Sequence, residues 1–277
     1  MNRIQQVFAQ LKRTNHGGFI PFITAGDPDL ATTKSLLIEL AQAGADIIEL
    51  GVPFSDPVAD GEVIQRASAR AIHNGVTLPA VLECVRQVRD YISKPIVLFS
   101  YFNPLLQFGE ERLALEAKRA GIDGVLVTDL LPEQAQTWSA RLCQQGIDPI
   151  FLVAPTTTDH RLRTITKLAS GFIYAISRIG VTGARDHLPS AAQELVQRIR
   201  AITDLPIAVG FGVSNREQVA QVCQFADAAV IGSAIVREIE KLNGADDLVT
   251  RIGVFTRSLL PHKTYPTNFP LPIRLVL

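Results

Sequence analysis

The chain has 277 residues, 47% of them hydrophobic, and its 27 basic and 27 acidic residues leave a formal net charge of zero. This length suits either two small domains or one α/β barrel. The neutral charge argues against a nucleic-acid partner, which normally requires a basic patch or stripe. We also expect no membrane span, because no apolar run approaches the roughly 18 residues that a spanning helix needs.

Eight short β-rich runs recur along the chain and predict strands. Most are near-continuous apolar runs, which is typical of parallel strands that are covered on both faces. The predicted strands cover residues 18–26, 45–52, 95–101, 124–129, 148–153, 171–177, 206–212 and 228–233.

Helical patterns separate these predicted strands. Several of them end at a glycine, a common stop signal at a helix C-terminus. The predicted helices cover residues 31–44, 78–92, 111–121 and 132–146, with an additional N-terminal helix at 1–13 and an extra helix after the second strand at 62–73.

The alternation of eight strands with helices favours one α/β domain, a (β/α)8 TIM barrel over residues 1–260. A doubly wound open sheet is the alternative, but its usual strand count is about six and no G-x-G-x-x-G motif opens the first helix. Residues 261–277 contain three prolines after Pro261 and no helical period, so we expect an irregular C-terminal tail.

Glu49 is a carboxylate in an otherwise apolar predicted strand. It alternates with Ile47 and Gly51 on one face, and the active site of such barrels lies at the C-terminal ends of the strands. An unpaired buried carboxylate has a raised pKa, which suits a general acid/base. A salt-bridged structural glutamate is the alternative, although no Lys or Arg lies nearby in the sequence to pair with it.

Two aspartates follow in the loop after this strand. Asp60 precedes the extra helix, where it would serve either as its N-cap or as a catalytic group. Asp56 lies between Ser55 and Pro57, where ordinary turn chemistry explains it equally well. The residues alone leave both choices open.

Glycine-containing turns after the seventh and eighth predicted strands indicate a phosphate site. In "GFGVSNREQV" (210–219), Ser214 and Glu217 predict a capping box, and in "IGSAIVREIE" (231–240) the strand leads directly into a helix. Glycines permit close backbone approach and helix N-termini favour anions, and these two loops form the recurrent phosphate site of TIM barrels.

The loop after the sixth predicted strand, "SRIGVTGARDHLPS" (177–190), is long and contains two glycines. These features suit a mobile lid that shields the site from water. An exposed loop with no special function explains them equally well.

The cysteines and histidines do not form a recognisable metal site. Cys84, Cys143 and Cys223 are far apart in apolar or helical surroundings, which predicts buried reduced thiols in a cytoplasmic protein. The five histidines show no ligand spacing, so we expect no metal.

Five segments in order along the chain resemble the tryptophan synthase alpha chain family, over roughly residues 1–260. The second segment is long and unusual, which makes the match specific. The segments are "PFITAGDPD" (21–29), "IELGVPFSDPVADGEVIQRA" (48–67), "SRIGVTGAR" (177–185), "GFGVS" (210–214) and "IGSAIV" (231–236).

This resemblance implies retro-aldol cleavage of indole-3-glycerol phosphate to indole and glyceraldehyde 3-phosphate in L-tryptophan biosynthesis, without a metal or organic cofactor. It implies that Glu49 is the general acid/base and that Asp60 holds the indole N–H. The implied substrate-binding residues are Phe22 and Phe211 beside the indole, Tyr174 near Glu49, Thr182 on the lid, and Gly183, Gly212, Gly232 and Ser233 around the phosphate.

The resemblance also implies a partner, the tryptophan synthase beta chain, which carries pyridoxal phosphate, in an α2β2 heterotetramer. The turn with Pro53, Asp56 and Pro57 resembles the family's loop that faces the beta chain, and "FNPLLQFG" (102–109) resembles a second such segment. Asp56 is therefore interpreted as an interface residue.

Three alternatives to this function remain: a stand-alone indole-releasing lyase of the same family, a non-catalytic barrel kept as an allosteric partner, and another phosphate-sugar barrel such as an isomerase. The sequence departs from the family pattern at Glu62, where a proline is expected, at the exit of the fourth strand, and in the tail after Pro261. None of these departures touches the proposed catalytic residues.

Overall fold

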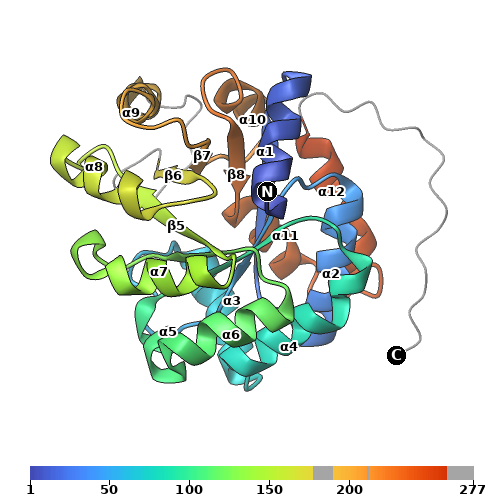
Figure 1. Ribbon diagram of the computed structural model, residues 1–277. Coiled ribbons are helices and arrows are strands. Elements are labelled where there is room, and N and C mark those ends of the chain that lie inside the picture. Colours follow the sequence, from blue (N-terminus) through green and yellow to red (C-terminus); the bar gives the residue numbers. More distant parts are fainter. Residues whose placement is uncertain (177–189, 211, 261–277) are drawn as a thin grey trace.

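The computed structural model describes residues 1–176, 190–210 and 212–260, whose eight strands form one closed parallel barrel (Figure 1). Each strand pairs with the next in chain order, and the pairing of Gly18 with Ala228 closes the ring. The strands are β1 (Gly18–Thr24), β2 (Ile48–Gly51), β3 (Ile96–Ser100), β4 (Gly124–Val127), β5 (Asp148–Val153), β6 (Ile173–Ile176), β7 (Ile207–Gly210) and β8 (Ala228–Ile231). All eight predicted strands are confirmed, and the open-sheet alternative is wrong.

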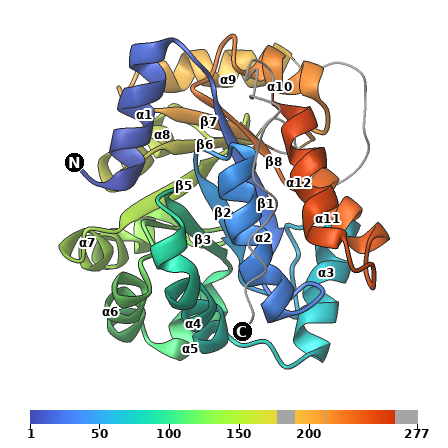
Figure 2. The same cartoon turned by 90° about the vertical axis from the view of Figure 1, so that its right-hand side faces the viewer.

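Helices surround the barrel, and α12 packs beside α2 to cover the side where β8 meets β1 (Figures 1 and 2). Those in the described part of the chain are α1 (Arg3–Thr14), α2 (Leu30–Ala43), α3 (Glu62–His73), α4 (Leu78–Val88), α5 (Phe102–Phe108), α6 (Glu110–Ala120), α7 (Gln136–Gln144), α8 (Asp159–Leu168), α9 (Ser190–Arg200), α10 (Arg216–Val222), α11 (Ser233–Lys241) and α12 (Leu248–Leu259). The predicted tail, residues 261–277, lies outside the described residues.

Two predicted helices have different ends in the structure. The helix expected over 78–92 stops as α4 at Val88 and continues as a 3₁₀ turn. The helix expected over 132–146 begins as a 3₁₀ turn at Pro132. The amide of Ala135 donates to the Pro132 carbonyl three residues back, 3.2 Å away, so the first turn is tighter than an α-helix.

The predicted glycine stops are confirmed at α2 and α6. Gly44 and Gly121 follow these helices with φ angles of 110° and 85°, in the left-handed region. A side chain at either position would be strained, because only glycine adopts this conformation without a steric penalty.

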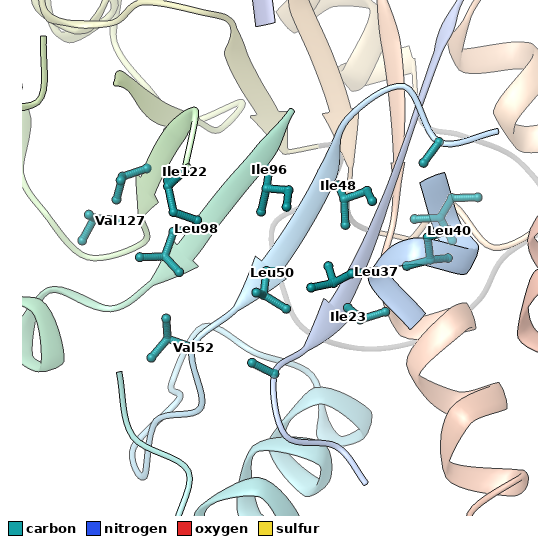
Figure 3. Close-up of a cluster of buried hydrophobic side chains, with 14 of the residues drawn as sticks. Ile23, Leu37, Leu40, Ile48, Leu50, Val52, Ile96, Leu98, Ile122 and Val127 are labelled. Atoms are coloured by element: carbon teal, nitrogen blue, oxygen red, sulfur yellow. The ribbon is translucent and has the colours of Figure 1, made fainter. Parts of the chain in front are cut away.

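The outer face of the strands packs against the helices and forms the larger hydrophobic cluster. Ile23, Leu50 and Leu98 project from β1, β2 and β3, and Leu37 and Leu40 of α2 lie against this layer (Figure 3). Because side chains alternate across a strand, Phe22, Glu49 and Val97 point the other way, into the barrel. These three residues are in register.

Helix α1 closes the N-terminal end of the barrel. Ile4, Phe8 and Leu11 join the inner hydrophobic cluster, and the Phe8 and Phe172 rings lie 5.7 Å apart. Leu11 contacts Gly18, the first residue of β1, which places the helix beneath the strands. The inner side chains are therefore approached from the C-terminal end of the barrel.

Three aspartates connect neighbouring strands at the same N-terminal end. Each carboxylate accepts a hydrogen bond from a backbone N–H of an earlier strand, and each aspartate amide donates back to that residue's carbonyl. The carboxylate contacts are Phe19 N to Asp46 (2.9 Å), Ile96 N to Asp123 (2.9 Å) and Ile207 N to Asp227 (2.8 Å). These bonds satisfy strand amides that parallel pairing leaves free.

Candidate active site

Glu49 lies on the inner face of β2, near the C-terminal end of the barrel. Its side chain is fully buried, and neither carboxylate oxygen has a hydrogen-bond partner among the described residues. Burial raises the pKa of Glu49 to about 8, because the charged form loses its hydration without gaining a cation. Among the described residues Glu49 forms no salt bridge, so the structural alternative is not supported. A carboxyl group that is protonated at neutral pH can deliver a proton.

Asp60 ends the loop between β2 and α3 and is 8% exposed. The N-cap of α3 is the next residue, Gly61, so the interpretation of Asp60 as this cap is wrong. Burial raises the pKa of Asp60 to about 6, and a hydrogen bond from the Tyr101 side chain partly offsets that effect. Near neutral pH, Asp60 is therefore mostly ionised while Glu49 is mostly protonated.

Tyr174 of β6 lies near these two carboxyl groups inside the barrel. It is buried, and its pKa is raised by burial and further by the charges of Glu49 and Asp60. Its hydroxyl lies against Gly210 at the end of β7, where a Cβ atom would be only 2.2 Å from the oxygen. The structure thus brings Glu49, Asp60 and Tyr174 together, and Gly210 makes room for the phenol.

Phe22 links this group to the turn after β8. Its ring packs edge-on against Phe99 with centroids 5.3 Å apart. It also lies over Gly51, and a Cβ atom at Gly232 would be 3.4 Å from its ring. An aromatic wall therefore connects the carboxyl groups to the predicted phosphate turn.

The two predicted phosphate turns lie before α10 and α11. Gly232 is the N-cap of α11 and provides no side-chain cap, and Ser233 is exposed at its first turn. Gly212 has a φ angle of 97°, which requires glycine. Backbone amides at the start of α11 are thus available to an anion.

The predicted capping box at Ser214 and Glu217 is wrong. The N-cap of α10 is Asn215, whose side chain accepts from the Gln218 amide at 2.9 Å. Ser214 instead donates its amide to the Gln218 side chain at 2.8 Å. The helix starts one position later than the sequence pattern indicates, because asparagine caps as well as serine does.

Comparison with known proteins decides the family. A model described as "Tryptophan synthase alpha chain" matches residues 8–261. The tryptophan synthase alpha chain of Geobacter sp. (strain M21) is 47% identical over 259 residues, which cover 94% of this chain and 97% of the relative. That of Polynucleobacter necessarius (strain STIR1) is 50% identical over 241 residues, covering 87% and 91%. This chain belongs to the tryptophan synthase alpha chain family.

Solved structures agree with this membership. The tryptophan synthase alpha subunit of Legionella pneumophila str. Paris aligns with a TM-score of 0.86 at 36% identity, covering 94% of this chain and 97% of that one. A chain of the tryptophan synthase complex from Pyrococcus furiosus aligns with a TM-score of 0.81 at 38% identity, covering 88% and 97%. The fold expected of a tryptophan synthase alpha chain is therefore confirmed.

Residues of the expected beta-facing loop differ in exposure. Pro53 is buried, Pro57 is partly buried, and Asp56 is exposed. Val58 in the same loop is 73% exposed, and Leu106 on the second expected segment, now α5, is 50% exposed. Each of the two expected segments therefore carries an exposed apolar side chain.

Three predicted site residues, Thr182, Gly183 and Phe211, lie outside the described residues. They stay predictions, as does the lid over residues 177–190. Tyr101 was not among the predicted site residues; it follows β3 and contacts Asp60 from a position 41 residues later in the chain. No local pattern identifies such a contact, although its place at the C-terminal end of a barrel strand is a general signal of function.

The sequence also predicts buried thiols and no metal site. Cys84 is buried and Cys223 partly buried, but Cys143 is exposed on α7, so the prediction that all three are buried is wrong. All three are free thiols. Within residues 1–176, 190–210 and 212–260, no group of three or more His, Cys, Asp or Glu side chains could hold a metal ion. No helix in this part of the chain is long and apolar enough to cross a membrane.

Proposed function

We propose that this chain is the alpha subunit of tryptophan synthase, a carbon–carbon lyase that cleaves indole-3-glycerol phosphate to indole and glyceraldehyde 3-phosphate. The observation that carries this proposal is the buried Glu49 carboxyl group, which faces the barrel interior without a hydrogen-bond partner among the described residues. Its raised pKa, about 8, gives it the proton that the reaction requires at neutral pH.

The first step is protonation of the substrate. Glu49 delivers its proton to C3 of the indole ring, which leaves a positive charge on the N1–C2 unit. The ionised Asp60 accepts the hydrogen bond of the indole N–H and stabilises this charge. The pKa values of about 8 and about 6 provide these different protonation states in one site.

The second step breaks the carbon–carbon bond. The Glu49 carboxylate takes the proton of the hydroxyl group on the carbon attached to C3. That carbon becomes the aldehyde of glyceraldehyde 3-phosphate, and the electrons of the broken bond restore the aromatic indole. Glu49 ends protonated, so the cycle balances without any cofactor, and we assign pyridoxal phosphate to the beta chain alone.

The remaining predicted residues hold the substrate. In this proposal Phe22 packs beside the indole, and Tyr174 lines the site near Glu49. The amides at Gly232 and Ser233, together with Gly212, receive the phosphate. In this proposal Thr182, Gly183 and Phe211 complete the site.

We further propose that the subunit works in the cytoplasm in an α2β2 complex with the tryptophan synthase beta chain. The exposed Asp56 and Val58 on the β2–α3 loop and the exposed Leu106 on α5 support a partner surface at the C-terminal face of the barrel. They favour the subunit over a stand-alone lyase. We assign residues 1–260 to the single barrel domain and 261–277 to a tail.

The experiment that tests the proposed activity is release of indole from indole-3-glycerol phosphate by the purified chain with the beta chain present. We expect Glu49→Gln to lower kcat by about 10² to 10⁴, the usual contribution of a general acid/base, with substrate binding retained. The matched control is Glu62→Gln, because Glu62 is an exposed carboxylate on the adjacent helix. Near-normal cleavage by Glu49→Gln would refute the mechanism.

A further inference from the structure

Tyr101 is a buried tyrosine directly after β3, at the C-terminal end of the barrel. Its hydroxyl oxygen accepts a hydrogen bond from the Ala59 amide at 2.9 Å. The same hydroxyl group is hydrogen-bonded to the Asp60 side chain. One phenol group therefore contacts both the backbone of the β2–α3 loop and the carboxyl group that the loop carries.

The direction of these two hydrogen bonds follows from the atoms involved. A phenol has a single proton to donate, and its oxygen can also accept. The Ala59 amide can only donate, so Tyr101 acts as acceptor toward it. The phenolic proton remains for Asp60, whose ionised carboxylate only accepts. A hydrogen bond to an ionised acceptor is about twice as strong as one between neutral groups.

Tyr101 is itself held in place, by a contact of its ring and by a hydrogen bond of the backbone that follows it. The ring of Phe54, at the start of the loop, packs against it with centroids 5.1 Å apart. The backbone after Tyr101 is also anchored, because the amide of Phe102 donates to Asp129 at 2.6 Å. Tyr101 thus contacts the beginning and the end of one loop from a fixed position on the barrel.

We propose that Tyr101 is a positioning residue that fixes the β2–α3 loop and aims the Asp60 carboxylate at the substrate. This inference rests on the proposed function, because it assumes that Asp60 binds the indole N–H. The loop begins at the end of the strand that carries Glu49, so the same contact sets the placement of Asp60 relative to Glu49. Loss of the phenol hydroxyl then affects the reaction without removing either carboxyl group.

The charged and titratable groups around this contact determine how it responds to pH. Asp60 faces Tyr101 directly, Asp129 acts on Tyr101 from the β4 side, and Glu49 and Asp60 both act on Tyr174. The Tyr101 hydrogen bond favours the ionised form of Asp60 and opposes the effect of burial on its pKa. Without the hydroxyl group, the pKa of Asp60 rises further above its ordinary value.

The test is Tyr101→Phe, assayed for indole release with the beta chain present across a range of pH. We expect kcat/KM at neutral pH to fall about tenfold, mostly through kcat, and the acid limb of the profile to move up by about one pH unit, as expected from loss of one charge-assisted hydrogen bond. Tyr91→Phe is the matched control, since Tyr91 is an exposed tyrosine outside the site. A purely structural role for Tyr101 would change stability and leave the acid limb in place.

A second measurement needs no variant. Hydrogen exchange of the Ala59 amide in the wild-type protein should be slow compared with that of Ser55, although both residues are exposed, because Ala59 donates to Tyr101. Fast exchange at Ala59, or a Tyr101→Phe profile that superimposes on the wild type, would overturn the proposal. Failure of the wild type to release indole would instead refute the proposed function, and the Ala59 measurement would still test the contact.

Discussion

At the scale of single residues, the two carboxyl groups predict the pH dependence of the reaction. Asp60 acts when ionised, so activity should fall as pH drops below its pKa of about 6. Glu49 must begin protonated, so activity should also fall as pH rises above its pKa of about 8. We expect a bell-shaped pH profile of kcat/KM with limbs near these two values. The measurement is the rate of indole release in the presence of the beta chain, at fixed ionic strength.

The two limbs can be assigned separately. In Asp60→Glu the acid limb should move while the alkaline limb stays, because only the carboxyl group at the indole N–H has changed. A profile that rises continuously through pH 8 would contradict the role of Glu49 as an acid.

The same residues indicate what the sequence could predict of the site. Strand periodicity and barrel polarity identified Glu49, and the inward orientation of its strand face is confirmed. Asp60 and Asp56 could not be separated from the residues alone, because the choice between cap and buried carboxylate depends on where α3 begins, and it begins after Gly61. Tyr101 was missed since its contact with Asp60 forms only when β2 and β3 pair.

At the scale of elements, the aspartate contacts between neighbouring strands should determine much of the stability of the N-terminal end of the barrel. Asp123 accepts from Ile96 N at 2.9 Å and pairs with Arg3 and with the mostly buried Arg89. Asp123→Ala leaves a buried amide and a buried cation without this partner. We expect the free energy of unfolding to fall by about 3 kcal/mol, measured by urea denaturation.

A matched variant separates this effect from the general loss of an acidic side chain. Asp90→Ala changes an exposed aspartate on the 3₁₀ turn after α4 and should alter the stability by less than about 0.5 kcal/mol. Equal stability of the two variants would show that the contact between β3 and β4 contributes nothing measurable.

The elements themselves were largely predictable, and their ends were not. All eight strands were found because apolar runs and glycine stops are local features of the sequence. The start of α7, by contrast, depends on whether the Ala135 amide bonds three or four residues back. The first turn of α10 depends on a competition between Ser214 and Asn215 for the capping position. Such choices differ by little energy, so the hydrophobic pattern does not decide them.

At the scale of the whole molecule, the barrel has two ends with different tasks. Helix α1 covers the N-terminal end with apolar side chains, while the C-terminal end carries the carboxyl groups and exposed apolar residues on the β2–α3 loop and α5. The proposed partner surface is thus continuous in sequence with the proposed active site, since the loop that carries Asp60 also carries Asp56 and Val58. If the proposed surface binds the partner, this loop would connect the partner to Asp60.

This arrangement predicts that a charge on α5 weakens assembly with the beta chain. In Leu106→Asp, an exposed apolar side chain becomes an anion that would have to be desolvated at the interface, which is unfavourable without a partner charge. We expect the dissociation constant for the beta chain to rise at least about tenfold, measured by sedimentation, and the acceleration of indole release by the beta chain to need correspondingly more beta chain. Val254→Asp is the control, because Val254 is similarly exposed but lies on α12, away from this surface. If Leu106→Asp assembles as tightly as Val254→Asp does, the partner surface does not include α5. Any effect of the beta chain on indole release would then have to act through the loop that carries Asp60.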